Sequence, residues 1–213
     1  IVYGPTAKTE FDTIIAEDGQ EFHVGDVKFK LPHTPGHTLE SSCYVLFDEE
    51  GSPNAVFTGD TLFIGEVGRP DLAQKGATLT IEDLAGMMYD SLRNKLMTLP
   101  DDVVVYPAHG AGSACGKNMS KETFDTLGNQ KANNYALRPD MSKQEFIKEV
   151  TEGLLPPPAY FPLNVKMNKG GYQSIEKVLA KGQHALSPME FEVAANKTGA
   201  VVLDVRHERE FVK

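Results

Sequence analysis

Three segments of this chain share one design, in which an apolar run leads into a turn that carries a histidine or an aspartate. The segments are TPGHT (34–38), FTGDT (57–61) and YPAHG (106–110). The end of a strand is rigid, and a neighbouring glycine lets the turn approach other backbone closely. If the turns converge, His37, Asp60 and His109 bring two imidazoles and one carboxylate together, a donor set for zinc, iron or manganese. Each turn alone indicates little, but three in order favour a metal site.

Composition and charge exclude several other classes of protein. The 213 residues include 21 basic and 30 acidic side chains, which gives a net charge of −9. This charge argues against nucleic acid or an anionic membrane as the main partner, because both require a basic surface. The sequence contains no apolar run of the roughly 18–20 residues that a membrane span needs. Two cysteines cannot form a disulfide framework, so we expect a cytoplasmic protein.

The first part of the chain has the pattern of an α/β fold. Strands are predicted over 21–30, as a hairpin that turns at Gly25, and over 42–47, 55–58 and 103–106. Helices are predicted to begin after Thr80 and Ser142, each of which is followed three residues later by an acidic residue, as in a capping box. The leucines and methionine between residues 84 and 99 recur at helical spacing, which indicates core packing.

The composition of the chain changes after residue 154, where prolines become frequent. The proline-rich residues 154–162 are predicted to be extended, because proline cannot continue a helix or a central strand. We place a domain boundary in this region, with one domain over 1–165 and a second over 166–213. In the second domain we expect a short helix after Ser187 and a buried strand over 200–205. Both ends of the chain look cut, so we expect an internal piece of a longer protein.

The three turn motifs resemble those of the metallo-β-lactamase superfamily, in its glyoxalase II and persulfide dioxygenase branch. The resemblance covers about residues 1–165 and implies an αβ/βα sandwich. It also implies that His37 and Asp60 ligate the catalytic metal, and that His109 ligates a second metal where that site is filled. In persulfide dioxygenases the histidine that matches His109 is retained but does not contact the iron. The family's HxHxDH motif is absent and by its usual position belongs upstream of Ile1, so we expect an N-terminally incomplete sandwich.

Two further segments indicate the branch. Residues 60–72, DTLFIGEVGRPDL, resemble the GRxD segment of persulfide dioxygenases, and residues 109–119 resemble bacterial members that are fused to rhodanese domains. Residues 203–211, LDVRHEREF, resemble the opening strand and turn of a rhodanese-like α/β domain. In that resemblance Asp204 and Arg206 belong to the DVR signature, and the nucleophilic cysteine would follow residue 213.

The resemblance implies a function and leaves two alternatives. A persulfide dioxygenase oxidises a thiol persulfide, such as glutathione persulfide, with O2 at one Fe(II), and two histidines with one carboxylate suit such non-haem iron chemistry. A glyoxalase II-type hydrolase would instead use two zinc or mixed metal ions to generate a hydroxide that attacks a thioester. The second alternative is a non-catalytic scaffold with a degenerate site. Within sulfide detoxification, we expect a homo-oligomer whose partners are a persulfide and O2.

Several residues near the motifs have more than one interpretation. Arg69 in the GRPD segment is a candidate for pairing with a substrate carboxylate, or for holding its loop through backbone carbonyls. Cys115 is interpreted as a small buried thiol, with a position facing the cleft as the alternative. His33 is a possible neighbour of the site. Because the HxHxDH ligands are absent, we expect residues 1–213 alone to be inactive and to hold metal incompletely.

Overall fold

The structure is a computed structural model that describes residues 1–73, 78–197, 199 and 201–211. The chain divides into two compact units, Ile1–Gly171 and Tyr172–Lys213. The division lies a few residues beyond position 165, where the sequence analysis placed its boundary. Among the described residues, no helix is both long enough and apolar enough to cross a membrane.

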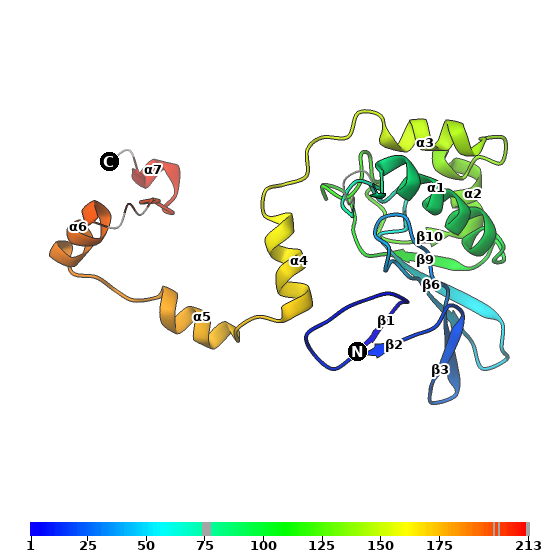
Figure 1. Ribbon diagram of the computed structural model, residues 1–213, viewed down its shortest axis with the longest axis horizontal. Helices are drawn as coiled ribbons and strands as arrows, with labels where there is room; N and C mark the ends of the chain where they lie inside the picture. Colours follow the sequence, from blue (N-terminus) through cyan, green and yellow to red (C-terminus); the bar gives the residue numbers. More distant parts are fainter. Residues whose placement is uncertain (74–77, 198, 200, 212–213) are drawn as a thin grey trace. The chain divides into compact units, whose positions relative to one another are not determined.

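A mixed six-stranded sheet organises the first unit (Figure 1). Its order is β10-β9-β6-β5-β4-β3, and only β6 and β9 run parallel to each other. The strands are β3 (Gln20–Val24), β4 (Val27–Leu31), β5 (Tyr44–Phe47), β6 (Pro53–Gly59), β9 (Val104–Pro107) and β10 (Asp125–Thr126). The predicted hairpin is confirmed, and Gly25 takes the positive φ of +61° that its tight turn needs.

Two small strand pairs accompany this sheet. The strands β1 (Val2–Tyr3) and β2 (Ile14–Ile15) pair in parallel near the N-terminus. The hairpin of β7 (Leu62–Phe63) and β8 (Glu66–Val67) follows directly after Asp60, and all four of its residues are buried. The segment that carries the GRPD sequence is therefore anchored at its start by a buried hairpin.

Helices cover one face of the sheet (Figure 1). They are α1 (Ile81–Ser91), which continues into the π-helical turn η2 (Leu92–Leu96), α2 (Leu127–Asn133), the 3-10 turn η3 (Tyr135–Leu137) and α3 (Lys143–Thr151). Both predicted capping boxes are confirmed: Thr80 with Asp83 begins α1, and Ser142 with Glu145 begins α3. The hydrophobic stripe between residues 84 and 99 lies in the core, as predicted.

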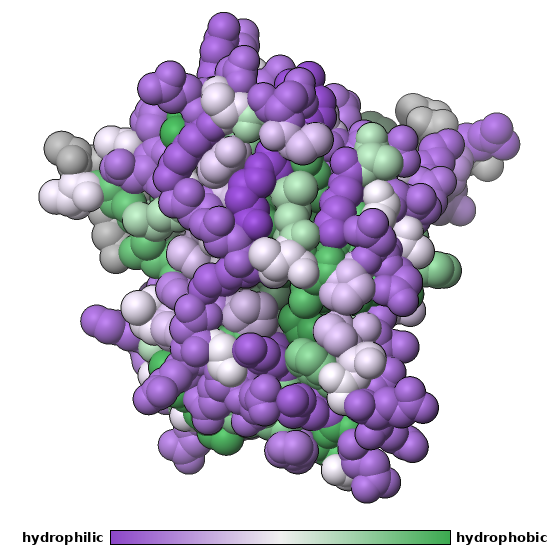
Figure 2. All heavy atoms as spheres, turned by 90° about the vertical axis from the view of Figure 1, so that its right-hand side faces the viewer, coloured by the Kyte–Doolittle hydropathy of each residue, from purple (hydrophilic) through white to green (hydrophobic). Residues whose placement is uncertain are grey.

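The two faces of the sheet differ because side chains alternate along a strand. The paired residues Val45, Val56 and Val105 are buried in the core with residues of α1 and α3. The adjacent pair Phe57 and Tyr106 points to the other face, with rings stacked 5.5 Å apart and about two-fifths of each residue exposed. The side of the molecule in Figure 2 is mostly hydrophilic, with hydrophobic residues gathered in a narrow band between polar ones.

The proline-rich segment is only partly extended. Residues 154–158 have no regular structure, as predicted, but helix α4 (Phe161–Gly170) begins inside the segment expected to be extended. Pro162 lies in the first turn of α4, where its missing N–H is not needed for an intrahelical hydrogen bond and its fixed φ suits the helix. The prediction for residues 161 and 162 was therefore wrong.

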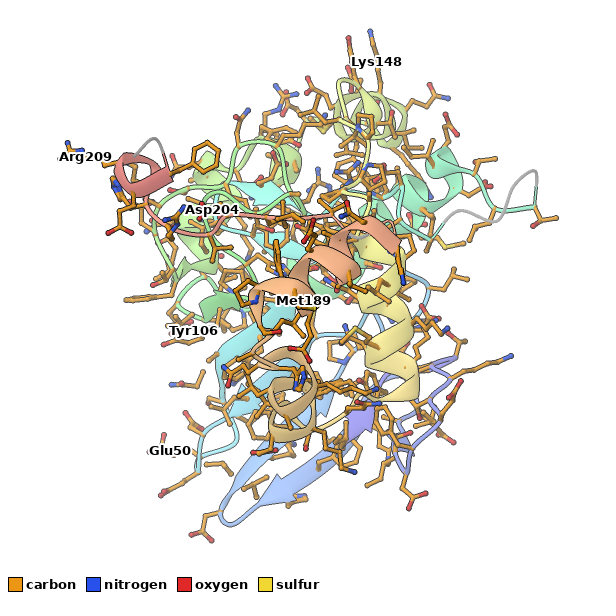
Figure 3. All side chains as sticks on the ribbon, turned by 90° about the vertical axis from the view of Figure 1, so that its left-hand side faces the viewer. Glu50, Tyr106, Lys148, Met189, Asp204 and Arg209 are labelled. Atoms are coloured by element: carbon orange, nitrogen blue, oxygen red, sulfur yellow. The ribbon has the colours of Figure 1, made fainter. Side chains whose placement is uncertain are left out.

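The second unit consists of short exposed helices: α5 (Ile175–Gly182), α6 (Pro188–Lys197) and α7 (Glu208–Phe211). The predicted helix after Ser187 is confirmed as α6, which carries Met189 (Figure 3). The predicted buried strand is wrong for residues 201–205, which are exposed and not in a strand, and residue 200 lies outside the described residues. A strand needs a hydrogen-bonded neighbour, and the described residues of this unit contain none.

Candidate metal centre

His37 lies in the turn between β4 and β5, against helix α1. Gly36 has a φ of +152°, and Ser91 of α1 donates a hydrogen bond to the carbonyl of Pro35 at 2.8 Å. The imidazole of His37 is buried, and its Nδ1 lies 2.8 Å from the backbone carbonyl oxygen of Arg69. This carbonyl can only accept a hydrogen bond, so Nδ1 donates to it, and Nε2 is the ring nitrogen that faces Asp60.

Asp60 follows β6 and lies between two histidines. Its Oδ2 is 3.2 Å from Nε2 of His37, and its Oδ1 is 2.6 Å from Nδ1 of His109. Burial opposes ionisation of this carboxyl group, but hydrogen bonds and charge from His37 and His109 outweigh burial and lower its pKa. The lowered pKa favours the anionic form of Asp60, which offers carboxylate oxygens between the two imidazole rings.

The arrangement of the strands explains why Asp60 and His109 meet. The parallel neighbours β6 and β9 both end at the same edge of the sheet, where Asp60 follows β6 directly and His109 is the second residue after β9. The amide of Ala108 also donates to the carbonyl of Gly59 at 3.0 Å, which joins the two turns. His109 is more exposed than the other two side chains, and its ring packs edge-on against Phe63. The predicted convergence of His37, Asp60 and His109 is thus seen in the structure.

Cys115 joins this group, which the sequence analysis gave only as the less favoured alternative. One ligand atom each from Asp60, His109 and Cys115 lie within 4.8 Å of one another. Cys115 is 8% exposed, and burial raises the pKa of its thiol. Its place six residues after His109 was the available signal, but spacing alone could not show that the loop folds back. The combined donors, imidazole nitrogen, carboxylate oxygen and sulfur, are those that zinc and iron accept.

The contacts of Arg69 are those of the loop-holding interpretation. Its Nε and Nη2 donate to the two carboxylate oxygens of Asp71 at 2.6 and 2.7 Å. Nη1 donates to the carbonyl of Ala114 at 3.1 Å, and Nη2 also donates to that of Leu155 at 2.5 Å. The residue is 5% exposed, so the guanidinium is enclosed by partners from its own chain. Arg69 thereby joins its own loop to the segments at Ala114 and Leu155, and its own backbone carbonyl orients His37.

Gly68 is required beside these ligands. A Cβ atom at this position would lie 1.8 Å from the carbonyl oxygen of Asp60 and 3.1 Å from Nδ1 of His37. Any side chain would therefore displace backbone that carries a candidate ligand. The glycine of the GRPD segment allows its loop to pack directly against both ligand turns.

Glu66 is a buried acidic residue that the sequence analysis missed. It is 2% exposed and accepts hydrogen bonds from the Tyr135 hydroxyl at 2.5 Å and from the amides of Val67 and Asn118. Burial, followed by the charge of Glu66, raises the pKa of Tyr135. These contacts tie the β7–β8 hairpin to the loop that contains Cys115, and no local sequence pattern indicates such partners.

The hydrogen-bond partners of His33 are residues outside this group, namely Asp18, Leu39 and Lys95. Its Nε2 lies 2.7 Å from the carbonyl of Leu39, and its backbone amide donates to Asp18 at 2.8 Å. Its carbonyl accepts a hydrogen bond from Lys95. The possibility that His33 neighbours the metal site is therefore not supported.

The comparisons with known proteins agree with this architecture. Residues 4–109 match the sequence profile of the metallo-beta-lactamase superfamily. Two solved structures share the fold: a metallo-beta-lactamase from Staphylococcus aureus subsp. aureus COL and ETHE1 from Myxococcus xanthus. The chain contains a domain of the metallo-β-lactamase superfamily with its mixed αβ sandwich fold, a superfamily of metal-dependent enzymes.

The relatives differ in how much of each chain is shared. The S. aureus protein is 33% identical with a TM-score of 0.67, over 76% of this chain and 46% of that one. ETHE1 from M. xanthus is 30% identical with a TM-score of 0.62, over 79% of this chain and 64% of that one. The probable hydroxyacylglutathione hydrolase glo2 of Schizosaccharomyces pombe is 40% identical over 97 residues, which are 46% of this chain and 33% of that protein. The chain spans less than half the length of such curated relatives.

The superfamily match ends at residue 109. The proposed rhodanese-like character of residues 166–213 is not part of that match, and it stays a prediction from the DVR signature.

Proposed function

We propose that this domain belongs to a persulfide dioxygenase that holds one iron ion between His37 and Asp60. The observation that carries the proposal is the close pairing of His37 Nε2 with Asp60 Oδ2, 3.2 Å apart, at the edge where β6 and β9 end. Similarity to ETHE1 from M. xanthus supports it, as does the resemblance of the GRPD segment to persulfide dioxygenases.

Each nearby residue then has a definite task. His37 and Asp60 supply one nitrogen and one oxygen ligand, and the resemblance assigns the remaining histidine ligand to an HxHxDH segment. The Arg69 carbonyl holds the Nδ1 proton of His37, and His109 holds the second oxygen of Asp60. When bound, iron supplies the redox chemistry that allows O2 to react with the persulfide sulfur. The protein's contribution is to fix the ligand directions and to orient the reactants.

The overall reaction is R–S–SH + O2 + H2O → R–SH + SO3²⁻ + 2 H⁺. The S–S bond breaks, the terminal sulfur loses four electrons, and O2 accepts them. The thiol that carried the terminal sulfur is released as R–SH. Glutathione, coenzyme A, bacillithiol and sulfide itself each fit the role of this carrier.

Oxygen uptake with several persulfides tests this function. We expect uptake and sulfite release from protein that contains an HxHxDH segment together with this domain, and neither from residues 1–213 alone. Lys143→Gln, which changes only an exposed ion pair with Asp90 on the helical face, serves as the matched control. Hydrolysis of a thioester without oxygen uptake would contradict the dioxygenase.

A glyoxalase II-type thioester hydrolase is the second candidate. One observation favours it: the two oxygens of Asp60 face different histidines, which is an arrangement that could bridge two metal ions. The similarity to the probable hydroxyacylglutathione hydrolase of S. pombe also supports it.

Metal content separates the two candidates. We expect His37→Ala and Asp60→Ala, made in protein that contains the HxHxDH segment, to lose nearly all bound iron, because each removes a direct ligand. His109→Ala should keep most of its iron, because its ring only holds Asp60. Metal analysis after dialysis gives the stoichiometry. Two metal ions per chain, or loss of all metal in the His109 variant, would move the assignment to the hydrolase.

A further inference from the structure

A chain of buried hydroxyl and thiol groups lies directly behind the two ligand turns. Thr34 and Cys43 are fully buried, and Thr61 is 1% exposed. The two hydroxyl oxygens, Oγ1 of Thr34 and Oγ1 of Thr61, are 2.9 Å apart, and Thr34 Oγ1 is 3.3 Å from the sulfur of Cys43. The sulfur lies 3.6 Å from the carbonyl of Thr58. No water is needed to satisfy these groups.

The donors and acceptors of this hydrogen-bond network can be assigned in a single direction. The carbonyl of Thr58 can only accept, so the thiol of Cys43 donates to it. The hydroxyl of Thr34 must then donate to the Cys43 sulfur, and the hydroxyl of Thr61 must donate to Thr34. Burial raises the pKa of Cys43 to about 11, so the thiol keeps the proton that this arrangement requires at neutral pH. A directed, fully satisfied network of this kind is rigid.

The network connects the segments that carry the candidate ligands. Thr34 lies three residues before His37, and Thr61 follows Asp60 directly. These two turns come from different parts of the chain, 27 residues apart at the hydroxyl pair. Besides this hydroxyl pair, the contact between the His37 and Asp60 side chains links the two turns directly. A bound cation would replace that contact.

We propose that Thr34 and Thr61 are positioning residues whose hydroxyl pair sets the separation of His37 and Asp60, so that both side chains are ready to hold one cation. This inference rests on the metal site of the proposed function. Outer hydrogen bonds that orient metal ligands typically change affinity by about 10–100-fold. The effect expected here lies at the lower end, because neither threonine contacts a ligand side chain directly.

The test compares Thr34→Val and Thr61→Val, which keep the shape but remove a hydroxyl, with Thr34→Ser and Thr61→Ser, which keep the hydroxyl. Thr80→Val is the matched control, because it removes the capping hydroxyl of α1 far from this network. Two quantities are measured on the 213-residue chain. The first is the ¹⁵N NMR shift of His37 Nε2 without metal, and the second is Zn²⁺ affinity by competition with a chelator.

Both valine variants should move the His37 Nε2 signal and weaken Zn²⁺ binding about tenfold. The double valine variant should show no larger loss, because either single substitution already breaks the hydrogen bond between the two hydroxyl groups. Both serine variants and Thr80→Val should keep the wild-type signal and affinity, although Thr80→Val lowers stability.

A wild-type His37 signal in the folded valine variants would overturn the proposal. If the wild-type chain binds no Zn²⁺, the metal-free NMR comparison still decides the role of the threonines, whereas the metal assignment of this chain is what fails. If Zn²⁺ binds equally well to wild-type and valine variants, the positioning role is wrong and the metal site stands.

Discussion

Two side chains in and behind this site, His37 and Cys43, are oriented by backbone carbonyls that can only accept a hydrogen bond. The Arg69 carbonyl selects the tautomer of His37, and the Thr58 carbonyl selects the direction of the Cys43 thiol. Backbone carbonyls cannot rotate or change protonation state, so they are dependable orienting groups. The side chains that matter for chemistry are therefore positioned mainly by backbone, and this backbone is fixed by the sheet and its turns.

The buried thiol of Cys43 should lower the stability of the fold at alkaline pH. Burial raises its pKa from 9.0 to about 11. Between these values the unfolded chain loses the proton and the folded chain keeps it, so stability falls as pH rises. Two pKa units correspond to about 3 kcal/mol. Urea unfolding of wild type and Cys43→Ala at pH 8 and pH 11 measures the loss, which should be smaller in the variant. An equal loss in both proteins would contradict this account.

At the level of elements, the site depends on helix α1 as much as on the strands. Gly36 packs against the backbone of α1 at Met88, and Ser91 of α1 holds Pro35. Because α1 also packs against α3, the turn that carries His37 rests on the helical layer.

Gly36→Ala should be strongly destabilising. The new Cβ would lie 2.4 Å from Cβ of Met88 and 2.8 Å from its backbone nitrogen, at a φ of +152°. Since helix backbone cannot move aside, we expect a loss of about 3 kcal/mol or more in the free energy of unfolding, measured with urea.

Gly51→Ala is the control for this substitution. Gly51 also has a positive φ, +82°, but no atom lies near the position of its Cβ. Only backbone strain is added, so the expected loss is about 1–2 kcal/mol. Similar losses at the two positions would show that close packing on α1 is not what requires Gly36.

At the scale of the whole molecule, the hydrophobic core cluster of the first unit lies on the helical face of its sheet. Phe57 and Tyr106 remain partly exposed on the other face, near Phe29 and Phe124, with ring centroids between 5.5 and 6.3 Å apart along the row. Exposed aromatic surface of this kind favours association with other apolar surfaces.

The two units should differ in protection from hydrogen exchange. None of the described residues from 172 onward is classed as buried, whereas β5, β6 and β9 all contribute to the core. Amides of α5 and α6 should exchange at least about a hundredfold faster than those of the three strands, because local opening there exposes little apolar surface. Mass spectrometry after exchange measures both in one sample, with α3 as an internal helical control. Equal protection of α5 and α3 would contradict this prediction.

Features that depend on neighbours along the chain could be predicted from the sequence. Capping boxes at Thr80 and Ser142, the turn at Gly25 and the apolar strands were predicted because each is built from residues within a few positions of one another. The three ligand turns were predicted for the same reason, since strand ends and glycines are visible locally. Their convergence followed from the family's motif order as well as from the residues.

Features that depend on what lies opposite a residue became visible in the folded structure. Arg69 is enclosed by Asp71, Ala114 and Leu155, and Cys115 folds back onto Asp60, although no local pattern shows either contact. The apolar residues 201–205 failed to form the predicted strand because strand formation requires a paired neighbour, which local propensity cannot supply. Burial and pairing are properties of two surfaces that meet, so one stretch of sequence cannot determine them alone.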